Sequence, residues 1–208
     1  MVTLAINTAT LDTEIAILDL EAKKILAEKS WRSECNEAET LLPEILKLLK
    51  KSKINFKDLK KVIVVKGPGS FTGLRVGITI ANMIANLLKI PVEGVDTFTF
   101  LERSFPKEIT EKKDATLILF AGRKEVYLKS TSPATPQAKP ALIKLEEVQP
   151  SKALYGELRP DQDIPHESKR ATLGKTILNL KPKDLKKEKI INPVYIKGPA
   201  ISKPKPIK

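Results

Sequence analysis

The residue pattern with the clearest chemical potential is a glycine-rich segment that follows an apolar run. Residues 67–77 read Gly-Pro-Gly-Ser-Phe-Thr-Gly-Leu-Arg-Val-Gly. The apolar run at 62–65 predicts a buried strand, and the apolar residues at 78–88 predict a helix. A helix that begins directly after such a turn directs unpaired backbone N–H groups outward, which suits an anion. The segment lacks the Gly-Lys-Ser/Thr ending of a P-loop, so that nucleotide motif is excluded.

The predicted helix also carries a stripe of small residues. Gly73, Gly77, Ala81 and Ala85 recur every four positions and therefore share one face. Each glycine inside a helix costs roughly 1 kcal/mol relative to alanine, so another part of a backbone must pack very close to this face. Two interpretations remain open: the helix lies tightly on its own sheet, or it packs against a helix of another subunit.

Alternating and periodic apolar residues predict the elements that must position this segment. Three strands are predicted at 2–7, 14–20 and 25–31, which favours an antiparallel meander. Asn36 is a plausible cap for a helix with an apolar face over 41–49. The glycine-rich helix is followed by a strand at 92–95 and a short helix at 97–105. Beyond these lie a predicted hairpin (117–121 and 125–130) and a helix (172–180), whereas 131–170 shows no clear pattern.

Composition narrows the class of protein. A chain of 208 residues can bury a core in one domain or two small lobes. No apolar stretch reaches the roughly 18 residues of a membrane span, and no secretory signal is visible at the N-terminus. The single cysteine, Cys35, excludes an internal disulfide framework, and the only histidine, His166, has no visible link to it. We therefore expect a cytoplasmic protein with an inert thiol and no membrane contact.

Positive charge is concentrated at the C-terminal end. The net charge is +12, and residues 181–208 contribute +7 through nine lysines set against Asp184 and Glu188. Such a tail attracts a polyanion, tRNA included, in a salt-dependent way. The alternative is a solvated end that keeps the chain soluble. The tail contains no arginine, the residue suited to bidentate phosphate recognition.

Four segments resemble one protein family. Residues 67–77 resemble the signature of the TsaB (YeaZ) family, bacterial proteins of tRNA threonylcarbamoyladenosine synthesis, and Ala5 to Thr10 resemble its N-terminal Ile-Asp-Thr-Ala-Thr. Residues 125–127 resemble a strand of its second half, and 193–196 its Pro-x-Tyr-Leu ending. The resemblance is strong over 1–100, patchy over 101–200 and absent from the lysine- and proline-rich end.

The order of predicted elements, βββαβαβα, is that of the ribonuclease H-like lobe of actin, sugar kinases and Hsp70 chaperones. We therefore expect an α/β, actin-like (ASKHA) fold in which helices flank a mixed sheet. The expected organisation is a complete N-terminal lobe (1–105), a reduced second lobe (106–180) and a loose basic tail (181–208).

This superfamily resemblance implies a nucleotide-phosphate site between the lobes. The family pattern has an aspartate in the first turn where this chain has Asn7, which holds Mg²⁺ less well and cannot act as a base. Thr8 and Thr10 could still donate to a phosphate, unless the turn is purely structural. The candidate phosphate-binding set, for ATP or ADP, is Asn7, Thr8, Thr10, Gly67, Gly69 and Ser70.

The sequence offers no catalytic group and no metal site. The family resemblance implies a comparison with TsaD, the catalytic paralogue, which carries a His-x-x-x-His metal motif. The corresponding stretch of this chain, residues 35–40, contains no histidine. Glu37 and Glu39 point in different directions on a helix, so a solvated helix start explains them better than a metal. No Ser/His/Asp or Cys/His arrangement is available, and the family's older peptidase label finds no support.

The family resemblance also implies a contact surface for TsaD, or for a second copy of the chain, on segments 37–51 and 71–88. An aspartate at Gly77 or Ala81 is expected to block that pairing while leaving the monomer folded. The predicted interface residues are Leu41, Leu42, Ile45, Leu46, Gly73, Gly77, Ala81 and Ala85.

Three functional hypotheses follow. The first is a non-catalytic scaffold subunit of the threonylcarbamoyl transferase complex, which pairs with TsaD, admits the ATPase TsaE and modifies the tRNA adenosine next to the anticodon. The second is a small ATP-binding kinase or hydrolase of the same superfamily. The third is an RNA-binding module driven by the basic tail at Lys181–Lys208.

Overall fold

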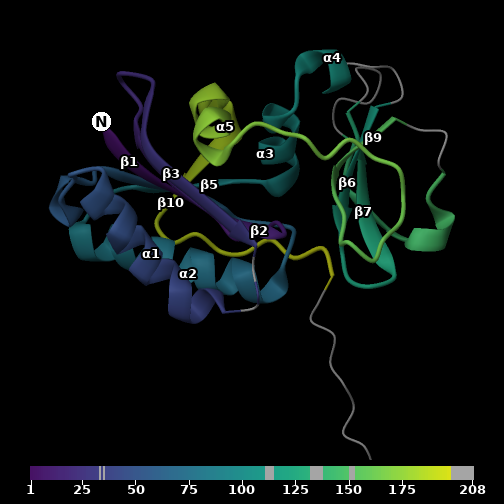
Figure 1. Cartoon of the computed structure of the whole chain (residues 1–208), viewed down its shortest axis with the longest axis horizontal. Coiled ribbons are helices and arrows are strands. Elements are labelled where there is room, and N and C mark those ends of the chain that lie inside the picture. The colour runs from purple at the N-terminus through teal and green to yellow at the C-terminus, as the bar shows by residue number, and fades with distance from the viewer. Residues whose placement is uncertain (33, 35, 111–114, 132–137, 150–152, 198–208) are drawn as a thin grey trace, which may run out of the picture.

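The chain folds into two lobes, each built on one sheet (Figure 1). The computed structural model describes residues 1–32, 34, 36–110, 115–131, 138–149 and 153–197. Cys35, expected to be an inert thiol, and the end of the basic tail beyond residue 197 lie outside the described residues.

The first lobe holds a six-stranded mixed sheet with the strand order β10-β5-β4-β1-β2-β3. Its strands are β1 (Val2–Asn7), β2 (Asp12–Asp19), β3 (Lys24–Arg32), β4 (Lys61–Val65), β5 (Val92–Val95) and β10 (Leu185–Glu188). β1, β2 and β3 form the predicted antiparallel meander, whereas β4 runs parallel to β1 and β5 runs parallel to β4. The predicted α/β fold with a mixed sheet is confirmed.

Helices cover both faces of this sheet. α1 (Glu37–Lys51) and α2 (Phe71–Leu88) lie side by side on one face, and α3 (Thr97–Ser104) and α5 (Leu173–Asn179) lie on the other (Figure 1). Two 3-10 turns, Phe56–Asp58 and Pro182–Asp184, connect elements of this lobe. The sheet is therefore buried on both faces, which explains why β1 and β4 are almost entirely apolar and buried.

The second lobe is smaller and has the strand order β8-β7-β6-β9. Its elements are α4 (Lys107–Thr110), β6 (Ala115–Phe120), β7 (Glu125–Ser130), β8 (Ala141–Lys144), a 3-10 turn (Leu145–Glu147) and β9 (Ala153–Glu157). The predicted hairpin of β6 and β7 is present, and β9 pairs parallel with β6. β8 and β9 lie in the part of the sequence that showed no clear pattern.

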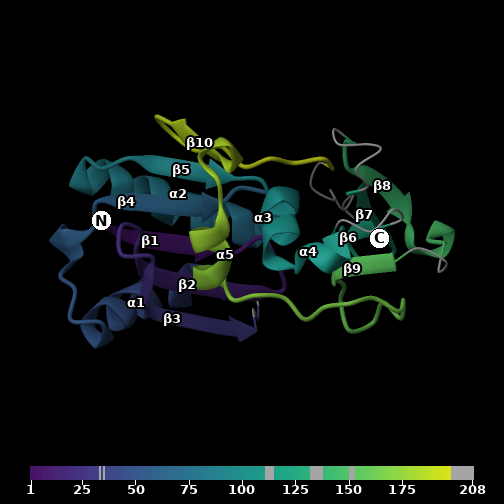
Figure 2. The same ribbon diagram turned by 90° about the horizontal axis from the view of Figure 1, so that it is seen from above.

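The expected lobe boundaries are wrong at the C-terminal end. After β9 the chain returns to the first lobe, where α5 packs on the sheet and β10 pairs with β5 from Leu185↔Val95 to Glu188↔Val92. The following residues stay attached, because Val194 N–H donates to the Lys66 carbonyl and Asn82 makes two hydrogen bonds with the Ile191 backbone. The described tail residues 181–197 are therefore built into the first lobe, not loose (Figure 2).

The start of α1 differs from the expected solvated turn. Asn36 occupies the N-cap position, but its side chain makes no capping hydrogen bond. Glu37 is buried because it heads the same helical face as Leu41 and Ile45, which packs into the core. Only Glu39 of the two acids faces solvent.

The small-residue stripe of α2 packs against the turn between β1 and β2. A Cβ atom added to Gly77 would lie 2.1 Å from Thr8 Oγ1, and one added to Gly73 would lie 2.2 Å from the Thr8 carbonyl oxygen. Gly69, just before the helix, would meet the Ala9 carbonyl oxygen at 2.1 Å. Of the two open interpretations, the structure thus supports close packing within the chain.

α2 is also the only helix in the described part of the chain that could cross a membrane by length and composition, with 18 residues. The expectation that no stretch reaches this length was therefore wrong. Its buried residues pack on β4 and β1, and the Ser70 hydroxyl caps its start by accepting from Gly73 N–H. The apolar composition of α2 is accounted for by its place in the core.

The close approach at Gly77 predicts a measurable cost for a single methyl group. We expect Gly77→Ala to lower the free energy of unfolding by about 1–3 kcal/mol, because the methyl overlaps Thr8. Alanine would otherwise be the better helix former by ~1 kcal/mol. Urea denaturation followed by circular dichroism checks this.

The exposed Thr79→Ala on the same helix is the control and should change stability little. In a Thr8→Ala background the cost of Gly77→Ala should shrink, because the nearest overlapping atom is gone. A Gly77→Ala protein as stable as the parent chain would contradict this packing.

Candidate functional site

The structure brings the two predicted phosphate-binding segments together at the junction of the lobes. Ser70 N–H donates to the Ala9 carbonyl at 2.9 Å, so the glycine-rich loop is joined directly to the β1–β2 turn. The Gly67 carbonyl accepts from Thr97 N–H at 2.9 Å, which links the same loop to the start of α3. The six predicted residues therefore form one continuous patch of backbone, as the superfamily resemblance implies.

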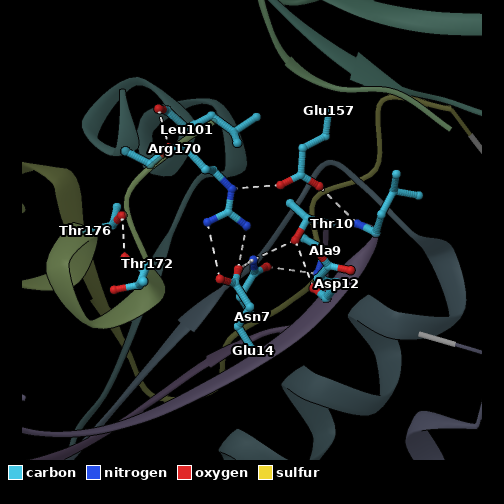
Figure 3. Close-up of polar contacts among 12 residues, drawn as sticks. Asn7, Ala9, Thr10, Asp12, Glu14, Leu101, Glu157, Arg170, Thr172 and Thr176 are labelled. Atoms are coloured by element: carbon cyan, nitrogen blue, oxygen red, sulfur yellow. Dashed lines mark hydrogen bonds and ion pairs between the residues drawn. The ribbon is translucent and has the colours of Figure 1, made fainter. Parts of the chain in front are cut away.

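The polar side chains of the turn are engaged with other parts of the chain. Asn7 Nδ2 donates to Thr10 Oγ1 at 2.7 Å and to Glu14 Oε2 at 2.8 Å, and Asn7 Oδ1 accepts from Ala9 N–H (Figure 3). The Thr10 hydroxyl in turn donates to the Asp12 carbonyl at 3.1 Å. Asn7 and Thr10 are both buried, so their hydrogen-bonding capacity is used inside the fold.

Three residues that the sequence did not single out complete this network. Arg170 lies between two carboxylates: its Nη2 is 2.6 Å from Glu14 Oε2, and its Nε is 2.8 Å from Glu157 Oε1 (Figure 3). We call Glu14, Glu157 and Arg170 the ion triad. It joins β2 of the first lobe, the end of β9 in the second lobe and the segment that returns to the first lobe.

Two further contacts hold the ion triad in place. The second oxygen of Glu157 accepts from Leu11 N–H at 3.1 Å, next to the β1–β2 turn. The Arg170 guanidinium lies 5.3 Å from the centre of the Phe100 ring, a cation–π distance. All three ionic side chains are about nine-tenths buried or more, so the charges depend on one another for stability.

This arrangement does not fit a nucleotide phosphate at the β1–β2 turn. The donors of Asn7 and Thr10 are already used, and the Thr8 hydroxyl points at Gly77 inside the fold, buried without a hydrogen-bond partner. Two carboxylates against one guanidinium leave negative charge where phosphates would need positive charge. The geometry therefore favours the structural interpretation of the turn.

The start of α2 faces a separate small cavity of about 340 Å³ between the lobes. The loop residues Gly69 and Ser70 line it together with Arg123 and Arg159 of the second lobe. Arg159 is paired with Asp161, and Lys197 at the same cavity is paired with Glu125. Anion binding by this helix start stays a prediction.

The ion triad itself borders a larger cavity of about 710 Å³, which lies between β3 and the segment that precedes α5. His166 lines this cavity, with its Nδ1 atom 2.8 Å from the Ile164 carbonyl oxygen. Within the described residues, no three side chains of His, Cys, Asp or Glu cluster as a metal-ligand group.

Most of the predicted interface residues are buried inside the chain. Leu41 and Ile45 belong to the core, and Gly73, Gly77, Ala81 and Ala85 face the sheet and the β1–β2 turn. A buried aspartate at Gly77 or Ala81 would disrupt the monomer itself, so the expectation of a folded variant that fails to pair is wrong. Only Leu42 and Leu46 of the predicted set lie toward the surface.

A different apolar stripe lies on the outer side of the same two helices. On α2 it consists of Val76, Ile80, Met83 and Leu87, which are spaced four, three and four residues apart. Leu46 of α1, Met83 and Leu87 are 49%, 44% and 67% exposed. We call these residues, with Leu42, the outer face. The signal for it was the helical periodicity of large apolar residues beside the glycine stripe, whereas polar residues such as Thr79 lie opposite the glycines.

The ion triad predicts a pH-dependent loss of stability when its cation is removed. Burial raises the pKa of the Glu157 carboxyl, against the opposing effect of Arg170. In Arg170→Met the two buried carboxylates lack a partner, so we expect a loss of about 3–5 kcal/mol in the free energy of unfolding. Without the opposing effect of Arg170, the folded-state pKa of Glu157 lies further above its unfolded-state value, so stability falls as pH rises through the folded-state pKa.

Urea denaturation at pH 5 and pH 8 checks this, and the deficit of Arg170→Met should be larger at pH 8. Arg159→Met, which removes an arginine from an exposed ion pair, is the matched control and should cost less than about 1 kcal/mol. An equal deficit at both pH values, or none, would contradict the role assigned to the triad.

Comparison with known proteins bears on the family and the fold of the chain. The family model of TsaD, tRNA N6-adenosine threonylcarbamoyltransferase, matches residues 32–166. The tRNA threonylcarbamoyladenosine biosynthesis protein TsaB of Buchnera aphidicola (Schizaphis graminum) is 34% identical over 53% of this chain and 51% of its own. TsaB of Bacillus subtilis is 35% identical over 49% of this chain and 43% of its own. The chain thus spans about half the length of the curated TsaB relatives it matches.

Two further comparisons cover more of the chain. An uncharacterized protein of Mycobacterium bovis, Mb3455c, is 32% identical over 73% of this chain and 69% of its own. The solved structure of YeaZ from Pseudomonas aeruginosa superposes with a TM-score of 0.61 at 19% identity, covering 86% of this chain and 89% of its own, which shows a shared fold. From the sequence matches and this fold together, the chain belongs to the TsaB (YeaZ) family of tRNA threonylcarbamoyladenosine biosynthesis proteins.

Proposed function

We propose that this protein acts in the synthesis of tRNA N6-threonylcarbamoyladenosine as a non-catalytic scaffold subunit in the cytoplasm. In this role it pairs with TsaD, the threonylcarbamoyltransferase, and the pair admits the ATPase TsaE. The proposal is supported by the names of the curated relatives and by the TsaD family model that covers residues 32–166.

The observation that carries the proposal is the outer face of α1 and α2. Both helices bury their inner sides in the core, yet large apolar side chains remain exposed on their outer sides. An exposed apolar patch on a chain that already has a complete core is typical of a protein–protein contact. Two adjacent helices offer the ridges for packing against a helix pair of TsaD, or of a second copy in a homodimer.

The kinase or hydrolase alternative is disfavoured by the ion triad. An ATP-dependent enzyme of this superfamily needs free donors and a metal-binding acid at the first turn. Here Asn7 replaces the acid and donates to Glu14, which Arg170 holds in place, and the Thr10 hydroxyl donates to the Asp12 carbonyl. A scaffold needs this turn only as a packing element for α2, which is how the chain uses it.

The outer face predicts which single substitutions break the complex. Leu46→Asp and Leu87→Asp place a charge in an apolar contact, so each should weaken association with TsaD of the same organism at least tenfold. Both side chains are exposed, so the monomer should stay folded. Size-exclusion chromatography with light scattering measures the mass of the mixture, and thermal unfolding checks the fold.

Ile196→Asp is the control, because Ile196 is an exposed apolar residue (39%) beyond β10 that is not part of the outer face and, unlike Ile190, does not line the groove beside Met83. It should associate with TsaD like the parent chain. Normal pairing by both Leu46→Asp and Leu87→Asp would contradict the proposed interface, and no pairing by the parent chain, with or without ATP and TsaE, would contradict the scaffold role.

The ion triad further predicts that the isolated chain does not bind ATP in the micromolar range. The buried carboxylates repel phosphates, and no free side-chain donor of Asn7 or Thr10 compensates for them. Isothermal titration with ATP and Mg²⁺ measures this directly. Micromolar binding accompanied by Mg²⁺-dependent turnover would favour the enzyme alternative instead.

A further inference from the structure

The outer edge of the first sheet carries a dense row of lysines. β10 and the residues beside it form this edge, on the side of the sheet opposite β3 (Figure 2). The lysines are all exposed: Lys181, Lys183, Lys186, Lys187 and Lys189. We call them the edge lysines. Because β10 pairs with β5 along its length, they are held on a rigid strand and the turn before it.

The two acidic residues within this segment are directed to other cations. Asp184 accepts from Arg103 Nε at 2.9 Å and from Arg103 Nη2 at 3.2 Å. Glu188 is paired with Lys66, which lies under the strand beside Gly94. None of the edge lysines forms a salt bridge within the described residues, although the charge of Lys183 acts on Asp184. The row therefore presents an excess of positive charge to solvent.

The opposite edge of the same sheet, β3, shows that an edge strand can be protected from pairing with other chains without an excess of positive charge. Charged side chains on an edge strand prevent pairing with other chains. On β3, however, Lys29 is paired with Glu44, and Arg32 is paired with Asp12. The β3 edge is thus protected with balanced charges, whereas the β10 edge keeps its positive charge free.

A groove beside β10 extends the positive surface toward α2. It has a volume of about 700 Å³ and lies between β10 and the C-terminal half of α2. Lys187 and Lys189 line one side, and Lys89, which ends α2, lines the other. Cations from two separate elements therefore line one space, and Glu188 is the only acid among the described residues that line it. Several cations spread over two elements suit a chain of phosphates more than a single small anion.

We infer that the edge lysines, with Lys89, bind the phosphate backbone of RNA. The choice of tRNA as that RNA rests on the proposed function, whereas the polyanion site rests on the structure alone. The segment contains no arginine and no aromatic side chain between 181 and 190, so it offers point charges without bidentate or stacking contacts. Binding should therefore be independent of sequence and strongly dependent on salt.

The test compares two triple variants of the full chain. Lys186→Gln/Lys187→Gln/Lys189→Gln removes three edge lysines. Lys24→Gln/Lys50→Gln/Lys51→Gln removes three exposed lysines from β3 and the end of α1, with the same change in net charge. Fluorescence anisotropy with an unmodified tRNA transcript that has adenosine next to the anticodon measures affinity between 50 and 200 mM salt.

With five or more phosphate contacts, affinity of the parent chain should fall by about a hundredfold or more over this salt range. The edge variant should lose only about tenfold over the same range and bind more weakly at 50 mM, because fewer counterions are released. The control variant should follow the parent chain. Binding by the edge variant equal to the parent chain, equal losses in both variants, or no binding by the parent chain would overturn the inference.

Association with TsaD, measured on the same variants, separates this inference from the proposed function. The edge variant should still pair with TsaD, since it keeps every outer-face residue, although Met83 of that face lines the same groove as Lys187 and Lys189. Loss of TsaD pairing with unchanged tRNA binding would identify the edge as a protein-binding surface and overturn the inference. Failure of the parent chain to pair with TsaD would contradict the scaffold role and leave the RNA result to be judged alone.

Discussion

The close approach of α2 to the turn between β1 and β2 is the constraint on which the rest of the structure depends. Gly69, Gly73 and Gly77 leave no room for a side chain because Thr8 and Ala9 occupy that space. The helix is thereby fixed on the sheet at the distance of backbone contact. Its small residues face inward together with Leu74, Ile78 and Ile84. Val76 and Ile80 pack partly against the core, whereas Met83 and Leu87 are exposed.

The same approach changes the role of the turn. The side chains of the turn bond within the chain: Asn7 bonds to Glu14 and Thr10, and Glu14 bonds to Arg170. The ion triad therefore replaces a ligand as the partner of the turn and ties the second lobe to the first through Glu157. The turn used for packing and the exposed apolar side chains of the helix pair are the two features that support the proposed scaffold role.

Local pattern predicted most of the first lobe. The strands and helices from 2 to 104 lie within a few residues of their predicted positions, because their apolar periodicity is strong and their ends carry turn residues. β8, β9 and β10 were missed. β10 reads Leu-Lys-Lys-Glu, without strand propensity, and becomes a strand because the edge of β5 supplies a partner.

The site was predictable only in part. The pattern located Asn7–Thr10 and the glycine-rich loop, which the fold brings together as expected. Arg170 lies 156 residues from Glu14 in a segment without periodicity, so only the tertiary structure reveals their pairing. The interface stays a prediction, but most of the residues predicted for it are buried within the chain. The sequence could not show this, because close-packed glycines suit a partner helix and the chain's own turn equally well.

Hydrogen–deuterium exchange can be compared for the chain alone, with TsaD, and with ATP and Mg²⁺. If α1 and α2 form the contact and the turn is structural, TsaD should slow exchange in peptides from 37–51 and 71–88, and ATP alone should leave the turn at 7–14 unchanged. Protection of that turn by ATP, with no effect of TsaD on α1 and α2, would contradict both expectations.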